Sequence, residues 1–135
     1  MAEGVSLSES ACLRRVRALE EAGFIEGYTA LINQQKAGCP VNVFVNITLE
    51  RQEQAHLHAF EEAVRKVPEV MECYLMSGEY DYLLRVVVKD MEAYDAFYKR
   101  LIKRVPLNDV SSTFVMEEIK YTTALPLEPL AQTMV

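Results

Sequence analysis

The segment Ser77-Gly78-Glu79-Tyr80-Asp81 combines turn-forming residues with two carboxylates. Gly78 can adopt a positive φ without steric strain, and the side chains of Ser77 and Asp81 can hydrogen-bond the local backbone, so the segment predicts a tight turn. A turn of this kind leaves backbone amides free beside a carboxylate. Amides bind a negatively charged group and a carboxylate binds an ammonium group, so the segment is a candidate site for a zwitterion.

Two other interpretations of this segment stay open. Glu79 and Asp81 could act as a general acid and base, but the motif holds neither a nucleophile nor a histidine beside them. Alternatively, Asp81 caps the turn and Tyr80 covers the edge of a sheet, and the segment is purely structural.

A second candidate for chemistry is a predicted helix over residues 6–22, which carries three arginines. Ser8 is the expected N-cap, although Ser6 with Glu9 also fits a capping box, and Gly23 marks the end. At 100° per residue, one face is apolar and the opposite face is polar. The apolar face holds Cys12, Val16 and Leu19, and the polar face holds Ser10, Arg14, Arg17 and Glu21.

The polar face of this helix has the chemistry of a DNA contact. Hydroxyls such as those of Ser8 and Ser10 bind phosphates, and arginines such as Arg14 and Arg17 read base edges in the major groove. The alternative is an ordinary solvated face, because residues 1–35 contain three arginines against five glutamates. The net charge of −6 for the whole chain requires any DNA contact to be local.

Histidine and cysteine spacing predicts no metal site and no cofactor. His56 and His58 lie two apart on a predicted helix, so their side chains diverge by about 200° and cannot share an ion. The three cysteines, Cys12, Cys39 and Cys73, are odd in number and widely spaced, which favours reduced thiols over a disulfide framework. The sequence has no basic-then-apolar signal pattern and no apolar run near ~20 residues, so we expect a cytoplasmic protein.

These candidate residues need a scaffold, and the hydrophobic periods predict one of class α+β. Residues 41–50 alternate apolar and polar side chains, which predicts a strand, and further strands are expected at 71–76, 82–88 and 110–119. Helical stripes start near Gln54 and after the N-cap Asp90, and each ends at a Val-Pro pair. Two strand-helix-strand units predict a ferredoxin-like βαββαβ domain with both helices on one face of an antiparallel sheet.

The remaining chain predicts the domain organisation. Residues 1–33 carry the arginine helix and a strand over 24–32, residues 34–40 form a linker, residues 41–120 form the ferredoxin-like domain, and 121–135 are an irregular tail. From Leu83 to Val88 the strand is apolar on both faces except at Arg85. The face of the sheet away from the helices therefore needs a cover, which we expect to be another subunit. The residues expected on this face are Phe44, Tyr74, Met76 and Phe114.

Three motifs in this order resemble the Lrp/AsnC family of transcriptional regulators. They are LSESACLRRVRALEEAGFIEGYTALIN at 7–33, ECYLMSGEYDYLL at 72–84 and FVMEEIKYTTALPL at 114–127. The resemblance covers almost all residues from Val5 to Tyr121. It implies a helix-turn-helix that binds double-stranded operator DNA and a sensing domain, called a RAM domain, that dimerises through its sheets and assembles into tetramers or octamers. It also implies an amino-acid effector bound between dimers near the 77–81 loop.

One departure bears on DNA binding. Family members begin with two further helices, and this sequence starts almost at the recognition helix, so we expect either a chain shorter than its functional form or a loss of DNA affinity. The leading interpretation is an amino-acid-responsive regulator. The alternatives are an amino-acid-binding oligomerisation module that does not bind DNA itself and, less well supported, a small ferredoxin-like enzyme.

Overall fold

The computed structural model describes residues 8–50 and 53–128, and the chain divides into two compact units, residues 1–33 and 34–135. The first unit contains α1 (Glu9–Glu21). The Ser8 hydroxyl accepts a hydrogen bond from the Ala11 amide at 3.2 Å, as expected of an N-cap. Gly23, at φ 83°, ends the helix in the left-handed conformation that glycine tolerates. Ser6, the alternative cap, lies outside the described residues.

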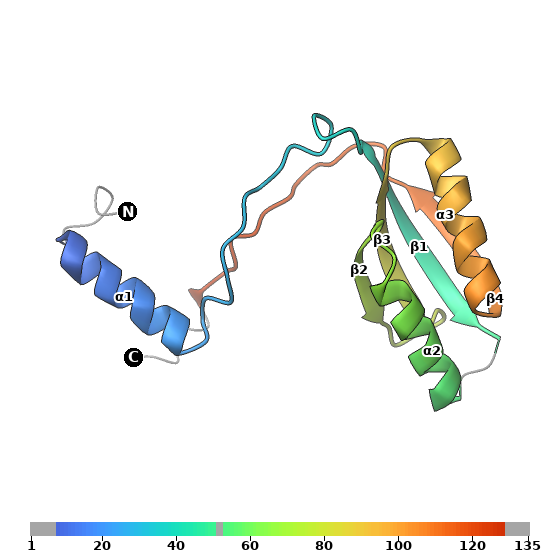
Figure 1. The fold of residues 1–135 in the computed structure, drawn as a ribbon, viewed down its shortest axis with the longest axis horizontal. Helices are drawn as coiled ribbons and strands as arrows, with labels where there is room; N and C mark the ends of the chain where they lie inside the picture. The colour runs from blue at the N-terminus through green and yellow to red at the C-terminus, as the bar shows by residue number, and fades with distance from the viewer. Residues whose placement is uncertain (1–7, 51–52, 129–135) are drawn as a thin grey trace. The chain divides into compact units, whose positions relative to one another are not determined.

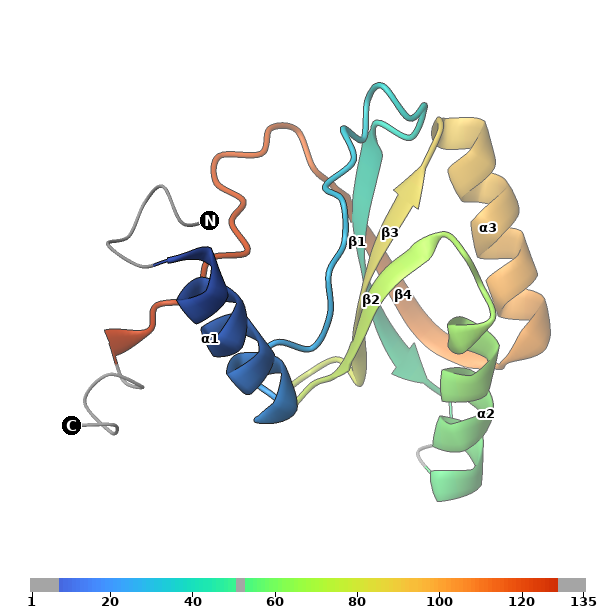
Figure 2. The ribbon, with the colours of Figure 1, turned by 60° about the vertical axis from the view of Figure 1, so that its left-hand side comes forward.

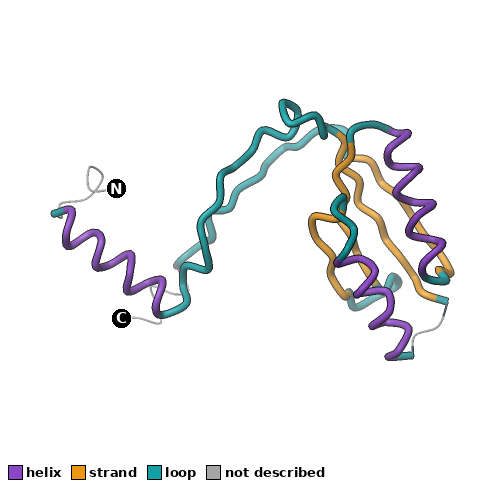
Figure 3. Tube along the Cα trace, viewed as in Figure 1, coloured by secondary structure: helices purple, strands orange, loops and turns teal. Residues whose placement is uncertain are grey.

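The strand predicted for residues 24–32 is wrong, because this stretch has no regular structure. Figure 3 shows loop from the end of α1 to the start of β1 (Val41–Leu49). A strand needs a hydrogen-bonded neighbour, and the described sheet offers none to residues 24–32. Local contacts hold the stretch to α1 instead: the Phe24 amide donates to the Leu19 carbonyl, and the Tyr28 hydroxyl donates to Glu20 at 2.9 Å.

The second unit is an antiparallel sheet of four strands with two helices on one face (Figures 1 and 2). The strands are β1, β2 (Val70–Leu75), β3 (Tyr82–Val88) and β4 (Leu107–Phe114), in the spatial order β2-β3-β1-β4. The helices are α2 (Gln54–Arg65) and α3 (Met91–Arg104). This arrangement confirms the predicted α+β, ferredoxin-like class.

The core lies between the helices and the sheet because each element presents one apolar face to it. The Asp90 carboxylate caps α3 by accepting from the Ala93 amide at 2.8 Å, and the alternating side chains of β1 and β3 reach the same layer. Burying each large side chain contributes about 1.5–3 kcal/mol. The largest fully buried side chains are Tyr82, Phe60, Phe97, Ile47, Leu84 and Leu101.

The last strand is shifted from its predicted position at 110–119. It begins at Leu107, directly after Pro106, because Leu107 pairs with Leu49 at the far end of β1. It ends at Phe114, and the Val115 amide makes the last hydrogen bond, to the Asn42 carbonyl. Since β1 begins at Val41, residues 116–119 have no length of β1 left to pair with.

The register also corrects one residue of the open face, the sheet surface away from the helices. Phe44, Tyr74 and Met76 are exposed, as predicted, with Phe44 37% accessible. Phe114 is Val43's neighbour across the ladder, so it lies on the helix side. Its ring stands edge-on to that of Tyr94, with centroids 5.4 Å apart. In the part of the chain that the structure describes, no helix has the length and apolar character needed to cross a bilayer.

Candidate functional site

The loop of residues 77–81 connects β2 to β3, where the sequence predicts a tight turn. Gly78 has φ 136°, a conformation that side-chain-bearing residues rarely adopt. A Cβ built on Gly78 would meet no atom within 4 Å, so a substitution here is strained by backbone conformation and not by crowding.

Asp81 fixes this loop to the end of β1. Its carboxylate Oδ2 accepts from the Leu49 amide at 2.9 Å, and its own amide donates to the Ile47 carbonyl at 2.9 Å. The Met76 amide closes the base of the hairpin by donating to the Asp81 carbonyl. At least one carboxylate oxygen of Asp81 therefore has a structural role, which also weakens the idea of an acid–base pair with Glu79.

The rest of the loop is accessible. Ser77, Gly78 and Glu79 are exposed, and Tyr80 is half-buried beside them. The backbone amides of residues 77–79 donate to no other described residue. The loop thus presents an exposed carboxylate and unpaired amides within three residues, which is the combination that zwitterion recognition requires.

The candidate DNA-contacting residues lie on α1. Ser8, Ser10, Arg14 and Arg17 are all exposed, and none of the α1 arginines forms an ion pair with a described residue. No residue of α1 is buried within the described structure, so Leu13 and Leu19 remain about half exposed on its apolar side. The helix therefore offers free cations on one side and an unfilled packing surface on the other.

A groove of about 560 Å³ crosses the open face of the sheet, between β1, β3 and residues 115–121. Arg85 lies in it and donates to Asn42 Oδ1 at 3.2 Å and to Gln34 Oε1 at 3.5 Å. Sequence reasoning noted Arg85 only as an interruption of an apolar strand. Its amide partners were not predictable, because they come from the linker and from β1.

Metal ligands are not brought together. Across residues 8–50 and 53–128, no three His, Cys, Asp or Glu side chains form a group that would hold an ion. His56 and His58 lie near different carboxylates, Glu53 and Glu61, at 3.9 Å in each case.

Comparison with known proteins shows what these two units resemble. Residues 42–125 match the Lrp/AsnC ligand binding domain, and residues 1–26 match a winged helix-turn-helix DNA-binding family. The chain belongs to the Lrp/AsnC family of transcriptional regulators. Its resemblance to that family, deduced from three motifs, is thereby confirmed.

Three Lrp/AsnC relatives illustrate the match. The DNA-binding transcriptional activator DecR of Escherichia coli (strain K12) is 45% identical over 129 residues, which are 95% of this chain and 85% of the relative. An AsnC family transcriptional regulator from Agrobacterium tumefaciens has a solved structure that is 50% identical, with a TM-score of 0.89 over 96% of this chain and 84% of that one. The transcriptional regulator NMB0573 of Neisseria meningitidis, solved with L-Met, is 38% identical with the same TM-score and coverage.

Proposed function

We propose that this regulator binds double-stranded operator DNA through α1 and that an amino acid, bound at the 77–81 loop, controls that binding. The observation that carries the proposal is the pairing of two features in one chain of the family. One is a capped helix whose exposed arginines form no ion pair with a described residue, and the other is a loop whose exposed carboxylate lies beside amides that donate to no described residue. A DNA partner implies that the protein acts in the cytoplasm.

The DNA half of the proposal assigns contacts by side-chain chemistry. Ser8 and Ser10, at the first turn of α1, are suited to phosphate oxygens, where the N-terminal end of a helix also favours negative charge. Arg14 and Arg17 follow on the same side, within reach of base edges once the helix lies in the major groove. The apolar side of α1, with Cys12 and Val16 half-buried, would hold the helix in place.

The DNA contact is tested by selecting operators from a random duplex library and measuring affinity by mobility shift. Arg14→Ala or Arg17→Ala should weaken binding by about 1–3 kcal/mol where the arginine reads a base, or reduce the salt dependence by about one unit where it meets a phosphate. Arg104→Ala, which removes the same charge from α3, is the control and should bind as the wild type does. Ligand-dependent assembly without selected operators would instead favour an amino-acid-binding module that leaves DNA to a partner.

The effector half assigns the loop residues by charge. Backbone amides near Ser77 and Gly78 would bind the effector carboxylate, Glu79 would face the ammonium group, and Tyr80 would line the side-chain pocket. Asp81 would hold the loop in position through its hydrogen bond from the Leu49 amide. L-methionine is the first probe, since a similar regulator has been solved with that amino acid.

Titration calorimetry tests this assignment. Gly78→Val should abolish amino-acid binding because a positive φ strains a β-branched residue and displaces the neighbouring amides. Gly38, which also has a positive φ but lies in the linker, provides the matched control: Gly38→Val should retain the wild-type affinity. Unchanged affinity in a folded Gly78→Val protein would place the effector site elsewhere.

The proposed assembly is a homodimer formed through the open faces of two sheets, which associates further into tetramers or octamers. The groove and the exposed side chains of Phe44 and Tyr74 supply the apolar part of that interface. A specific interface of this kind buries on the order of 1,200–2,000 Å² in total.

A further inference from the structure

A pocket of about 300 Å³ lies between α2 and β2, on the helix side of the sheet, and its lining includes none of the residues assigned to DNA or to the effector. It is bounded above by one side of α2 and below by β2, which is an edge strand of the sheet. The register of β2 slips between Val70 and Glu72, so Met71 is an extra residue on this strand. Bulges of this kind reshape a strand locally and recur beside binding sites.

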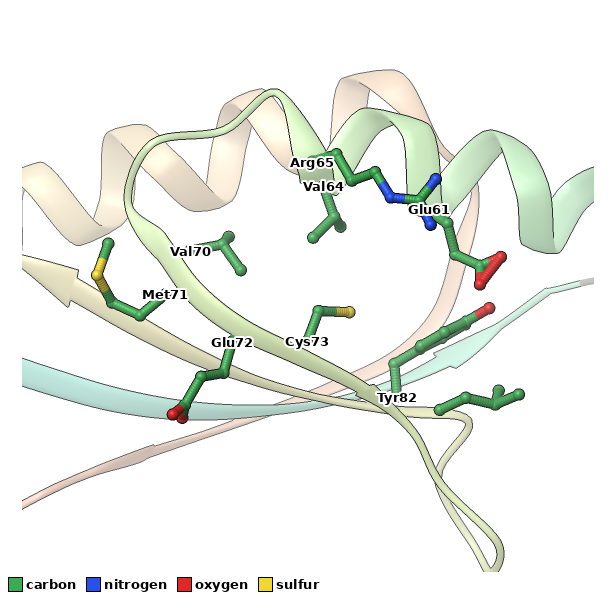
Figure 4. Close-up of a pocket in the computed structure, with 9 residues that line it drawn as sticks. Glu61, Val64, Arg65, Val70, Met71, Glu72, Cys73 and Tyr82 are labelled. Carbon is green, nitrogen blue, oxygen red and sulfur yellow. The ribbon is translucent and has the colours of Figure 1, made fainter. Parts of the chain in front are cut away.

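The floor of the pocket holds a polar group without a partner. Tyr82 is 1% exposed, and its hydroxyl makes no hydrogen bond to any described residue. An unpaired buried hydroxyl costs about 1–3 kcal/mol, so such groups are normally satisfied by another protein group or by ordered water, and one that is not calls for an explanation. Tyr82 lies in the wall of the pocket and its hydroxyl end points along it (Figure 4).

The charge nearest to this hydroxyl is negative. Glu61 projects from α2 over the same end of the pocket, and Figure 4 shows its carboxylate and the Tyr82 hydroxyl directed toward one another. Glu72 is on the opposite side of β2, so its carboxylate does not add to this charge (Figure 4). Arg65 stands at the rim, where its guanidinium is paired with Glu62 at 2.6 Å.

The remaining lining is apolar. Val64 from α2 and Cys73 from β2 point toward each other across the pocket, with Val70 beside them (Figure 4). Burial and the Glu61 carboxylate raise the pKa of the Cys73 thiol to about 11, so this side chain is a neutral, weakly polar part of the wall. A ligand that fits must therefore combine an apolar body with a small polar head.

We propose that this pocket binds a small primary ammonium compound with an aliphatic body, a site distinct from the effector loop. The ammonium group donates to the Glu61 carboxylate and to the Tyr82 oxygen, and the aliphatic part packs on Val64, Val70 and Cys73. An ammonium has three donors and no acceptor, so it satisfies both oxygens at once, which a carboxylate head would not do. Free alkylamines and aliphatic amino acids both carry this head, and an amino acid could add a contact from its carboxylate to Arg65.

The test uses methyl NMR on the full chain with three probes that share one carbon skeleton. Isoamylamine carries only an amine, isocaproate carries only a carboxylate, and L-leucine carries both groups. We expect isoamylamine to shift the methyl resonances of Val64 and Val70 in a saturable way and isocaproate to leave them unchanged. A response to L-leucine that is tighter than that to isoamylamine and weakened by Arg65→Ala identifies amino acids as the source of the head group. A response to isoamylamine that equals or exceeds that to L-leucine identifies free amines.

Variants separate binding from folding. Glu61→Gln should weaken isoamylamine binding about tenfold, because a charged hydrogen bond of about 1.5 kcal/mol is lost. Tyr82→Phe should also weaken it while the protein stays folded, since the hydroxyl has no partner among the described residues to lose. Glu92→Gln and Tyr98→Phe on α3 are the matched controls and should bind as the wild type does.

Three results would overturn the proposal: no methyl shift with either amine-bearing probe, an equal response to isocaproate, or unchanged affinity in Glu61→Gln. The outcome does not depend on the effector loop, because Gly78→Val should leave isoamylamine binding intact.

Discussion

The Tyr82 hydroxyl and the Cys73 thiol are two acidic groups held where their charged forms are disfavoured. Burial, and then the nearby Glu61 carboxylate, raises the pKa of Tyr82 to about 12 from its ordinary 10.0. Burial is also the main reason why the pKa of Cys73 rises from 9.0 to about 11, with Glu61 adding to it and Arg65 opposing it. Both residues line the same pocket, so they report on one local environment.

These shifts predict how stability falls in alkali. The unfolded chain loses the two protons at the ordinary pKa values, before the folded protein does, so their contribution is fully present below about pH 9. Stability then declines as pH rises toward the folded values of about 11 and 12. Urea unfolding across this range should show a shallower decline for Tyr82→Phe and for Cys73→Ala. Cys39→Ala is the control, and an equally steep decline in all variants would contradict the argument.

At the scale of elements, one carboxylate adds a side-chain link between the β2–β3 loop and β1, beside the ladder that pairs β3 with β1. The part-buried hydrogen bond from the Leu49 amide to Asp81 joins the loop to the last residue of β1. Asp81→Ala leaves that amide without its acceptor and should lower the free energy of unfolding by about 1–3 kcal/mol. Urea denaturation of the wild type and of Asp81→Ala at neutral pH measures this difference in the free energy of unfolding.

The matched control is Glu79→Ala in the same loop. Glu79 is exposed, so its removal should change stability by less than about 0.5 kcal/mol. Equal losses in the two variants would mean that Asp81 does not fix the loop to β1.

Elements whose burial pattern is local were predictable from sequence. The alternating apolar residues of β1 and the apolar stripes of α2 and α3 all pack on one core. The positions of these elements therefore follow from the spacing of their apolar residues alone. Pairing is not local. The early start of β4 and the inward position of Phe114 both depend on the length and register of β1. Residues 24–32 form no strand because the described sheet offers them no partner.

The same distinction holds for the candidate sites. The turn at 77–81 was predictable because Gly78 and its neighbours specify it locally. Asp81's link to Leu49, and the meeting of Glu61 with Tyr82, bring together residues of different elements. A strand period places Tyr82 on the inner face but does not show that its hydroxyl has no hydrogen-bond partner among the described residues.

At the scale of the whole molecule, the sheet has one covered face and one open face. The helices cover the side of Val45 and Leu84, which are fully buried. On the other side, Phe44 lies opposite Arg85 in the β1–β3 ladder, within a groove that reaches residues 115–121. A second copy placed on this face would bury Phe44 next to Arg85. The Arg85 guanidinium already donates to side-chain amide oxygens, so it would not be buried without partners.

Phe44 is therefore the residue whose substitution best tests self-association. Light scattering at micromolar concentration should give the wild-type chain at least twice its 15.4 kDa mass. Phe44→Glu should raise the dissociation constant of the dimer about thirtyfold or more. The substitution removes an aromatic side chain that contributes about 2 kcal/mol to the binding free energy, and it adds a charge that must be desolvated. The new carboxylate lies opposite Arg85 in its own sheet, so the folded monomer tolerates it.

The control for Phe44→Glu places the same charge on an exposed apolar residue elsewhere. Met91, 58% exposed at the first turn of α3, tolerates an acidic residue because a helix N-terminus favours negative charge. Met91→Glu should keep the wild-type mass. If the wild-type chain is a 15.4 kDa monomer at micromolar concentration, or if both variants dissociate alike, the open face is not the dimer interface. A monomer only in Phe44→Glu, with an unchanged circular dichroism spectrum, would locate the contact between copies on the face that the helices leave uncovered.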